Sequence, residues 1–155
     1  MDNAQIRLRY LRVNFIGLAM IGSVFLYAAV VEVLKRVLAP FAGFAALTPG
    51  QAQMMKYLFI ALAFANFFLI KFFQRILGSR SVEQLVQAAI VSFAMSEAVA
   101  IFGLMLFLLT GSAMDFYTFM FLSLFYFWFF FPKIKDWESQ LQAPPAAGAK
   151  DTAKG

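Results

Sequence analysis

The chain has 155 residues, of which 63% are hydrophobic, 18% aromatic and only 14% charged, and its net charge is +5. A water-soluble domain carries about 25% charged residues, so this composition predicts an integral membrane protein. The chain contains no Cys and no His, which excludes disulfides, thiolate nucleophiles, Ser-His-Asp chemistry and the usual zinc and haem ligands. We therefore expect a protein that is not an enzyme and that holds no cofactor and no metal.

A first transmembrane helix is predicted over about residues 13–34. The run from Val13 to Val31 carries no charge and, at 1.5 Å per residue, covers about 29 Å, close to the hydrocarbon thickness of a bilayer. It is longer than a signal-peptide core, and no clear small-residue cleavage site follows, so we expect it to be retained. Glu32 ends the run and is expected to form an ion pair at the interface with Lys35 or Arg36, which lie three and four residues later on the same face.

A second helix is predicted over residues 49–77, after a short interfacial loop. Thr48 and Gln51 form a capping box around Pro49, which suits the first helical position. Asn66 falls at mid-depth, where its amide needs a partner because lipid offers none.

A third helix, predicted over residues 82–110, carries the carboxylate of Glu97 near its middle. An acidic side chain at the bilayer centre costs roughly 2.5 to 3.5 kcal/mol, so we expect Glu97 to be protonated and to be the functional residue. The alternative is that neutral Glu97 only fixes helix packing. Small residues line one stripe of this helix at spacings of three and four and should allow close helix contact: Ala89, Ser92, Ser96, Ala100 and Gly103.

Depth also predicts a partner for this carboxyl. The predicted second and third helices are joined by a short turn, and counting from it places Asn66 and Glu97 within about 5 Å of the same depth. We therefore expect Asn66 to hydrogen-bond to Glu97, with Ser92 and Ser96 as further supporting residues.

A fourth helix is predicted over residues 115–131, after a second capping box at Ser112 and Asp115. It is so aromatic that most of its rings should face lipid or fill grooves between helices. The Pro, Ala, Gly and Lys tail over 138–155 is expected to be disordered. Basic residues concentrate near both termini and in the loop between the second and third helices, which predicts that both termini are cytoplasmic.

The segment AMSEAVAIFGLMLFLL around Glu97 resembles the second helix of the rotor-ring proteolipid, subunit c, of rotary ATP synthases. The resemblance covers about residues 61–109 and includes a basic turn with Arg80 and Glu83. It implies that Glu97 is the ion-carrying carboxylate, and Ala98, where sodium-type members place a hydroxyl, favours protons. The chain departs from that family where Ala61, Ala63 and Ala65 replace the glycines of a tight inner ring, and in its two additional helices.

The topology is also similar to that of ATP synthase subunit I, a small four-helix protein implicated in rotor-ring assembly. Two short motifs carry this second resemblance, one at Ala65, Asn66 and Phe67 and the other at Ser96, Glu97 and Ala98.

The sequence thus predicts an all-α, polytopic integral membrane protein with four transmembrane helices in one domain over residues 1–137. We expect a proteolipid-like, proton-translocating subunit. We expect it to be a multi-pass protein of the inner membrane of a bacterium. The alternative is a non-transporting accessory or assembly subunit. Its expected partners are membrane lipids and other membrane subunits or further copies of itself. No nucleic-acid surface is expected, because basic residues stand singly or in pairs at the ends of apolar runs.

Overall fold

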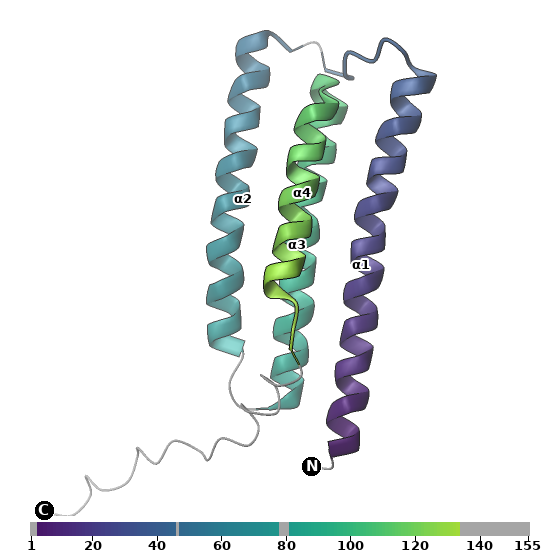
Figure 1. Cartoon of the computed structure of the whole chain (residues 1–155). Coiled ribbons are helices and arrows are strands. Elements are labelled where there is room, and N and C mark those ends of the chain that lie inside the picture. The colour runs from purple at the N-terminus through teal and green to yellow at the C-terminus, as the bar shows by residue number, and fades with distance from the viewer. Residues whose placement is uncertain (1–2, 46, 78–80, 134–155) are drawn as a thin grey trace, which may run out of the picture.

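The computed structural model describes residues 3–45, 47–77 and 81–133, with side chains for 7–45, 47–76 and 81–133. Four helices make up this part of the chain: α1 (Asn3–Val37), α2 (Pro49–Leu77), α3 (Val82–Thr110) and α4 (Ala113–Phe130). Successive helices run in opposite directions in an elongated up-and-down bundle (Figure 1). The predicted disordered tail at 138–155 and the predicted turn with Arg80 lie outside the described residues.

Each of the four helices is long and apolar enough to cross a membrane. The described residues are otherwise loops and turns, without a strand. The protein is therefore an all-α protein of the multi-pass membrane type, as its composition predicts.

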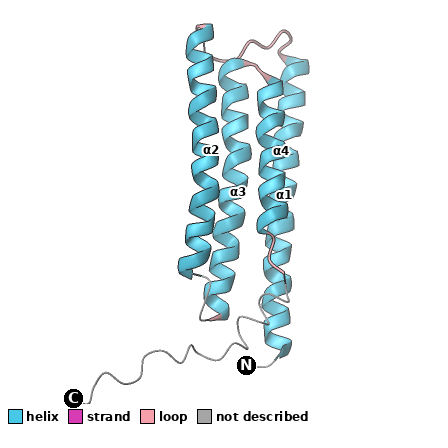
Figure 2. Ribbon diagram, turned by 60° about the vertical axis from the view of Figure 1, so that its left-hand side comes forward, coloured by secondary structure: helices cyan, strands magenta, loops and turns pink. Residues whose placement is uncertain are grey.

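Helix α3 is the centre of the bundle, because it packs against the other three helices. One apolar cluster joins α1 to α3 and α4, and it includes Val24 and Phe93. A second cluster joins α2 to the other side of α3, and it includes Ala63 and Val99. The order of the helices is visible in Figure 2, where α3 stands between α2 and the pair formed by α1 and α4. Helix α3 therefore has an α1 side and an α2 side.

The predicted stripe of small residues on α3 is buried, and its closest neighbour is α4. A Cβ atom added to Gly103 would lie 2.6 Å from the Cβ of Phe119 and 3.1 Å from the carbonyl oxygen of Phe116. The Ser123 hydroxyl on α4 donates to the carbonyl of Ser96 at 2.7 Å, and Ala89 and Ala100 are also buried. The aromatic helix thus makes a close local contact with α3, since the rings of Phe116 and Phe119 project to either side of it.

Capping explains where the helices begin and end. Thr48 and Gln51 bond reciprocally at the start of α2, and the Ser81 hydroxyl accepts from the backbone N–H of Gln84 at the start of α3. The Ser112 hydroxyl likewise caps α4 by accepting from the N–H of Asp115. The bounds predicted for the second and third helices agree with α2 and α3.

Helix α1 is the element whose predicted start was wrong. It begins at Asn3 and not near residue 13, so it has 35 residues. The added residues include three arginines and neither Pro nor Gly, and Arg is a good helix former. The helix therefore continues beyond the hydrocarbon region, where charged side chains reach water.

The loop after α1 crosses the end of the α3–α4 hairpin. The Phe44 N–H donates to the carbonyl of Leu108 at 2.7 Å, and the backbones of Gly43 and Gly111 lie against each other. Both glycines have positive φ, 88° and 73°, a conformation that a side chain disfavours. This contact fixes the end of α1 relative to the central hairpin.

Candidate functional site

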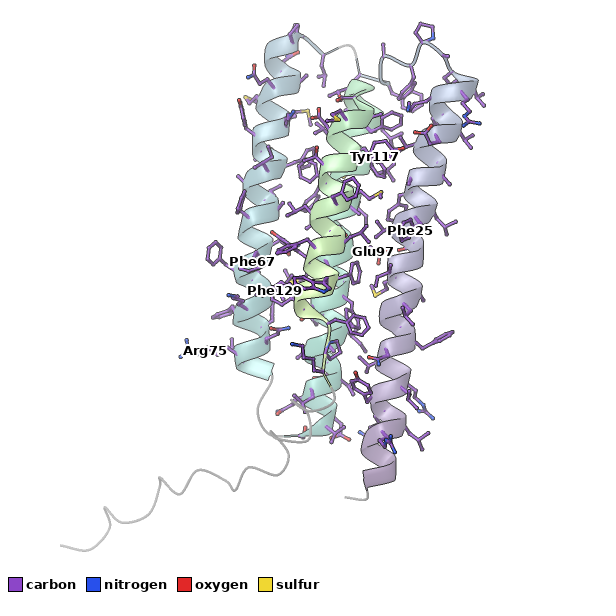
Figure 3. All side chains as sticks on the ribbon, in the orientation of Figure 1. Phe25, Phe67, Arg75, Glu97, Tyr117 and Phe129 are labelled. Atoms are coloured by element: carbon purple, nitrogen blue, oxygen red, sulfur yellow. The ribbon has the colours of Figure 1, made fainter. Side chains whose placement is uncertain are left out.

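Glu97 lies half-buried in the middle of α3, on its α1 side, as Figure 3 shows. Its Oε1 accepts a hydrogen bond from the Tyr27 hydroxyl at 2.7 Å and lies 2.5 Å from the Ser23 hydroxyl oxygen. Ser23 and Tyr27 are one turn apart on α1, so both hydroxyls reach the same carboxyl. The carboxyl thus lies midway along the seam between α1 and α3, with two hydroxyls of α1 as its partners.

The register between these two parallel helices is held at a second point. Arg9 of α1 forms an ion pair with Glu83 of α3, and these residues are 74 positions apart in the chain, as are Ser23 and Glu97. The two contacts are separated by 14 residues along each helix, or about 21 Å. Because the sequence separation is the same at both contacts, α1 and α3 keep one register over that length. This register places the carboxyl opposite its hydroxyl partners.

The geometry around Ser23 limits which hydrogen bonds can form at the same time. The Ser23 Oγ lies 2.5 Å from Glu97 Oε1 and also 2.6 Å from the carbonyl oxygen of Met20. A serine hydroxyl has one proton, whereas both of these neighbours would be acceptors if Glu97 were ionised. All the contacts are satisfied when Glu97 is protonated and donates to Ser23, while Ser23 donates to Met20 and Tyr27 donates to Glu97.

The predicted hydrogen bond between Asn66 and Glu97 is wrong. The Asn66 side chain is buried on the α2 side of α3, where its Nδ2 donates to the carbonyl of Met95 at 2.5 Å. The predicted depth of Asn66 agrees with its contact, since Met95 is two residues from Glu97, or about 3 Å along the helix axis. Two residues on a helix are about 200° apart, however, so a side chain at this depth on α2 meets the opposite face of α3.

Ser92 and Ser96, predicted as supporting residues, are buried but are bonded to other groups. The Ser92 hydroxyl donates to the carbonyl of Ala88 at 2.7 Å and accepts from Gln74 of α2 at 3.0 Å. The Ser96 hydroxyl donates to the carbonyl of Ser92 at 2.8 Å. Both serines therefore support helix packing around α3 and do not contact the Glu97 carboxyl.

The hydroxyl partners of Glu97 were not predicted from the sequence. Their spacing of four was the available signal, because it places two hydroxyl groups on one face near the middle of a predicted transmembrane helix. A polar face in that position needs a partner on a neighbouring helix.

A second acidic group, Glu32, lies nearer the end of α1. It accepts from the Tyr117 hydroxyl at 2.5 Å and pairs with Lys35 at 2.9 Å, which confirms the predicted ion pair. At the same end, Lys56 of α2 pairs with Asp115 of α4 at 2.5 Å. In the described part of the chain, no three His, Cys, Asp or Glu side chains are close enough together to hold a metal ion. Among the described residues Glu97 has no basic partner, so ion pairing does not account for this carboxyl.

Comparison of the chain with profiles of known protein families, with curated proteins and with solved structures finds no match. Function is therefore inferred from the site itself.

Proposed function

We propose that the protein binds and releases a proton at Glu97 and works as a proteolipid-like, proton-translocating subunit of a larger membrane assembly. The observation that carries the proposal is the arrangement around Ser23. Its hydroxyl oxygen lies within hydrogen-bond distance of both the Glu97 carboxyl and the Met20 carbonyl, and one added proton satisfies all three groups.

The position of the carboxyl supports exchange with a partner. Glu97 is half-buried at the edge of the α1–α3 seam, and the spanning part of α1 is only 17% buried inside the bundle. Loss of the proton would leave Ser23 with two acceptors and would place a charge in the hydrocarbon region, where it is costly. A neighbouring subunit that supplies a cation or water to this edge would lower the cost of the ionised carboxylate. Proton release would then depend on contact with that subunit.

Carbodiimide labelling tests the protonated state directly. A lipid-soluble carbodiimide modifies protonated carboxyls, so it should label Glu97 in vesicles and label it more slowly as the pH rises. Glu97→Gln should lose the label, whereas Glu32→Gln, at a carboxyl paired with Lys35, should keep it. Absence of labelling at Glu97, or labelling that does not change with pH, would contradict the proposal.

Translocation is tested with a pH-sensitive dye in the native assembly, reconstituted into vesicles. Proton flux should disappear in Glu97→Gln and remain in Glu32→Gln, while both variants should assemble normally. A Glu97→Gln assembly that conducts as well as the parent would overturn the transport role.

A non-transporting accessory or assembly subunit is the second candidate function. It is favoured by the same contacts, because a neutral Glu97 that bridges Ser23 and Tyr27 also holds α1 against α3. The spanning part of α2 is only 22% buried, which leaves apolar surface for larger membrane partners. Size measurement in mild detergent separates the two: a ring of identical copies supports transport, and a mixed complex that Glu97→Gln leaves intact and active supports the accessory role.

We further propose that both termini face the cytoplasm and that the membrane is the inner membrane of a bacterium. The orientation rests on the excess of Lys and Arg near the chain ends and the turn between α2 and α3.

A further inference from the structure

A groove of about 660 Å³ lies between α1 and α4, away from Glu97. Its walls are Tyr10 and Ile21 on α1, and Leu124, Phe127 and Trp128 on α4, followed by Phe131, Pro132 and Lys133. Figure 2 shows these two helices side by side, with the chain after α4 running beside the lower part of α1.

The floor of the groove is aromatic. The ring of Phe93, on α3, stacks on Phe127 at 5.9 Å and lies 5.5 Å from Phe131. The absence of a side chain at Gly17 lets these rings approach α1, since a Cβ there would lie 2.7 Å from Phe93. Such a surface offers large contact area to an apolar chain without ordering flexible side chains.

The two ends of the groove differ in chemistry. At one end Lys133 is exposed and forms no ion pair with the described residues, and the Tyr10 hydroxyl donates to the carbonyl of Pro132 at 3.1 Å. At the other end Ile21 and Leu124 are apolar. Tyr10 and Ile21 are 11 residues apart, about 16 Å along α1. That length matches one leaflet, which is half of a hydrocarbon core about 30 Å thick.

We propose that this groove binds an anionic phospholipid from the leaflet at the α1 N-terminal end. One acyl chain lies on Phe127 and Phe131, and the phosphate lies at Lys133. A transmembrane helix of a partner would need a groove that spans both leaflets, and a zwitterionic lipid would gain less from the ammonium group of Lys133. The proposal is independent of the role of Glu97. The cytoplasmic placement of Lys133 rests on the proposed orientation, and a cation at that surface attracts anionic headgroups.

Trp128 reports directly on the occupant, because it lines the groove and is 76% exposed. The chain has two tryptophans, so Trp137→Phe leaves Trp128 as the single tryptophan, which is excited selectively over the five tyrosines. The full-length protein in this background is reconstituted into vesicles that contain either brominated phosphatidylglycerol or brominated phosphatidylcholine. Bromine quenches Trp128 where a lipid occupies the groove.

Brominated phosphatidylglycerol should quench Trp128 with about fivefold higher relative affinity than brominated phosphatidylcholine, the effect of one cation near anionic lipid. Lys133→Gln should remove the preference. Arg75→Gln is the matched control, since it removes an exposed cation from the last turn of α2, at the same end of the bundle (Figure 3). It should leave the preference unchanged. Equal quenching by the two lipids, a preference that survives Lys133→Gln, or equal loss in both variants would overturn the proposal.

Discussion

At the residue scale, the hydrogen bond from Tyr27 to Glu97 is the most direct target. Tyr27→Phe removes the hydroxyl that donates to Oε1 at 2.7 Å and changes little else. Hydrogen bonds between transmembrane helices contribute about 0.6 kcal/mol on average and at most about 1.7. We expect the free energy of unfolding in mixed micelles to fall by an amount in this range.

A double-mutant cycle assigns that loss to the contact. Tyr27→Phe should cost almost nothing in a Glu97→Leu background, because the acceptor is already absent. Tyr57→Phe is the control: Tyr57 is exposed, and its hydroxyl accepts from Gln53 within α2. If Tyr27→Phe is equally destabilising with and without Glu97, the hydroxyl does not act through the carboxyl.

The separation of Asn66 from Glu97 makes a second prediction. These side chains share no hydrogen-bond partner in the structure, because one bonds to Met95 and the other to α1. The effects of Asn66→Leu and Glu97→Gln on unfolding free energy should therefore add to within about 0.5 kcal/mol. Unfolding of the two single variants and the double variant measures this sum. A coupling energy well above that value would indicate a direct hydrogen bond between Asn66 and Glu97.

These residues also show how far sequence predicts the site. The relative depth of Asn66 and Glu97 followed from counting along helices, because the axial rise is fixed. The identity of their partners depends on how each helix is rotated about its axis. The turn between α2 and α3 does not set that rotation. It is set by side-chain packing along the whole of α3, which gives it separate α1 and α2 sides.

At the element scale, the glycines of α1 and α3 form a graded series. A Cβ at Gly103 would collide with the Cβ and backbone of α4, a Cβ at Gly17 would meet the outer atoms of the Phe93 ring, and a Cβ at Gly22 would meet nothing within 4 Å. Backbone cannot move without separating the helices, whereas a ring can shift.

Gly103→Ala should therefore be destabilising by about 1–3 kcal/mol, the usual cost of overpacking. Gly17→Ala should cost less, and Gly22→Ala should be neutral or slightly stabilising, since Ala favours helix. Unfolding of the three variants by titration with a denaturing detergent measures the order. A Gly103→Ala protein as stable as Gly22→Ala would show that α3 and α4 are not in close contact.

The start of α2 was predictable because its capping residues, Thr48 and Gln51, are local signals in the sequence. The start of α1 was not, since loss of hydrophobicity marks the edge of the membrane and not the end of a helix. The prediction that most rings of the fourth helix face lipid or fill grooves did not include the close contact of α4 with Gly103. Composition shows that a helix is aromatic. The close contact at Gly103 depends on the position along α4 where successive rings project to opposite sides.

At the scale of the whole molecule, α1 and α2 are attached to opposite sides of a central α3–α4 hairpin. Polar contacts recur along both outer helices, at Arg9 and Glu32 for α1 and at Lys56 and Asn66 for α2. Charged pairs lie toward the ends, and the Glu97 cluster lies between them. These polar contacts hold the register of the helices, while the apolar surface of the bundle remains exposed to lipid.

The direction in which this bundle crosses the membrane is the last prediction. Because the chain contains no Cys, single cysteines can be introduced without removing native ones. Arg7 and Thr48 are both exposed and lie at opposite ends of the bundle, at the start of α1 and at the start of α2. With both termini in the cytoplasm, Thr48→Cys should react with an impermeant maleimide added to intact cells, whereas Arg7→Cys should react only after lysis. The reverse pattern would invert the protein and place Lys133 and its groove in the outer leaflet. It would leave the Glu97 site, which lies at mid-depth, unchanged.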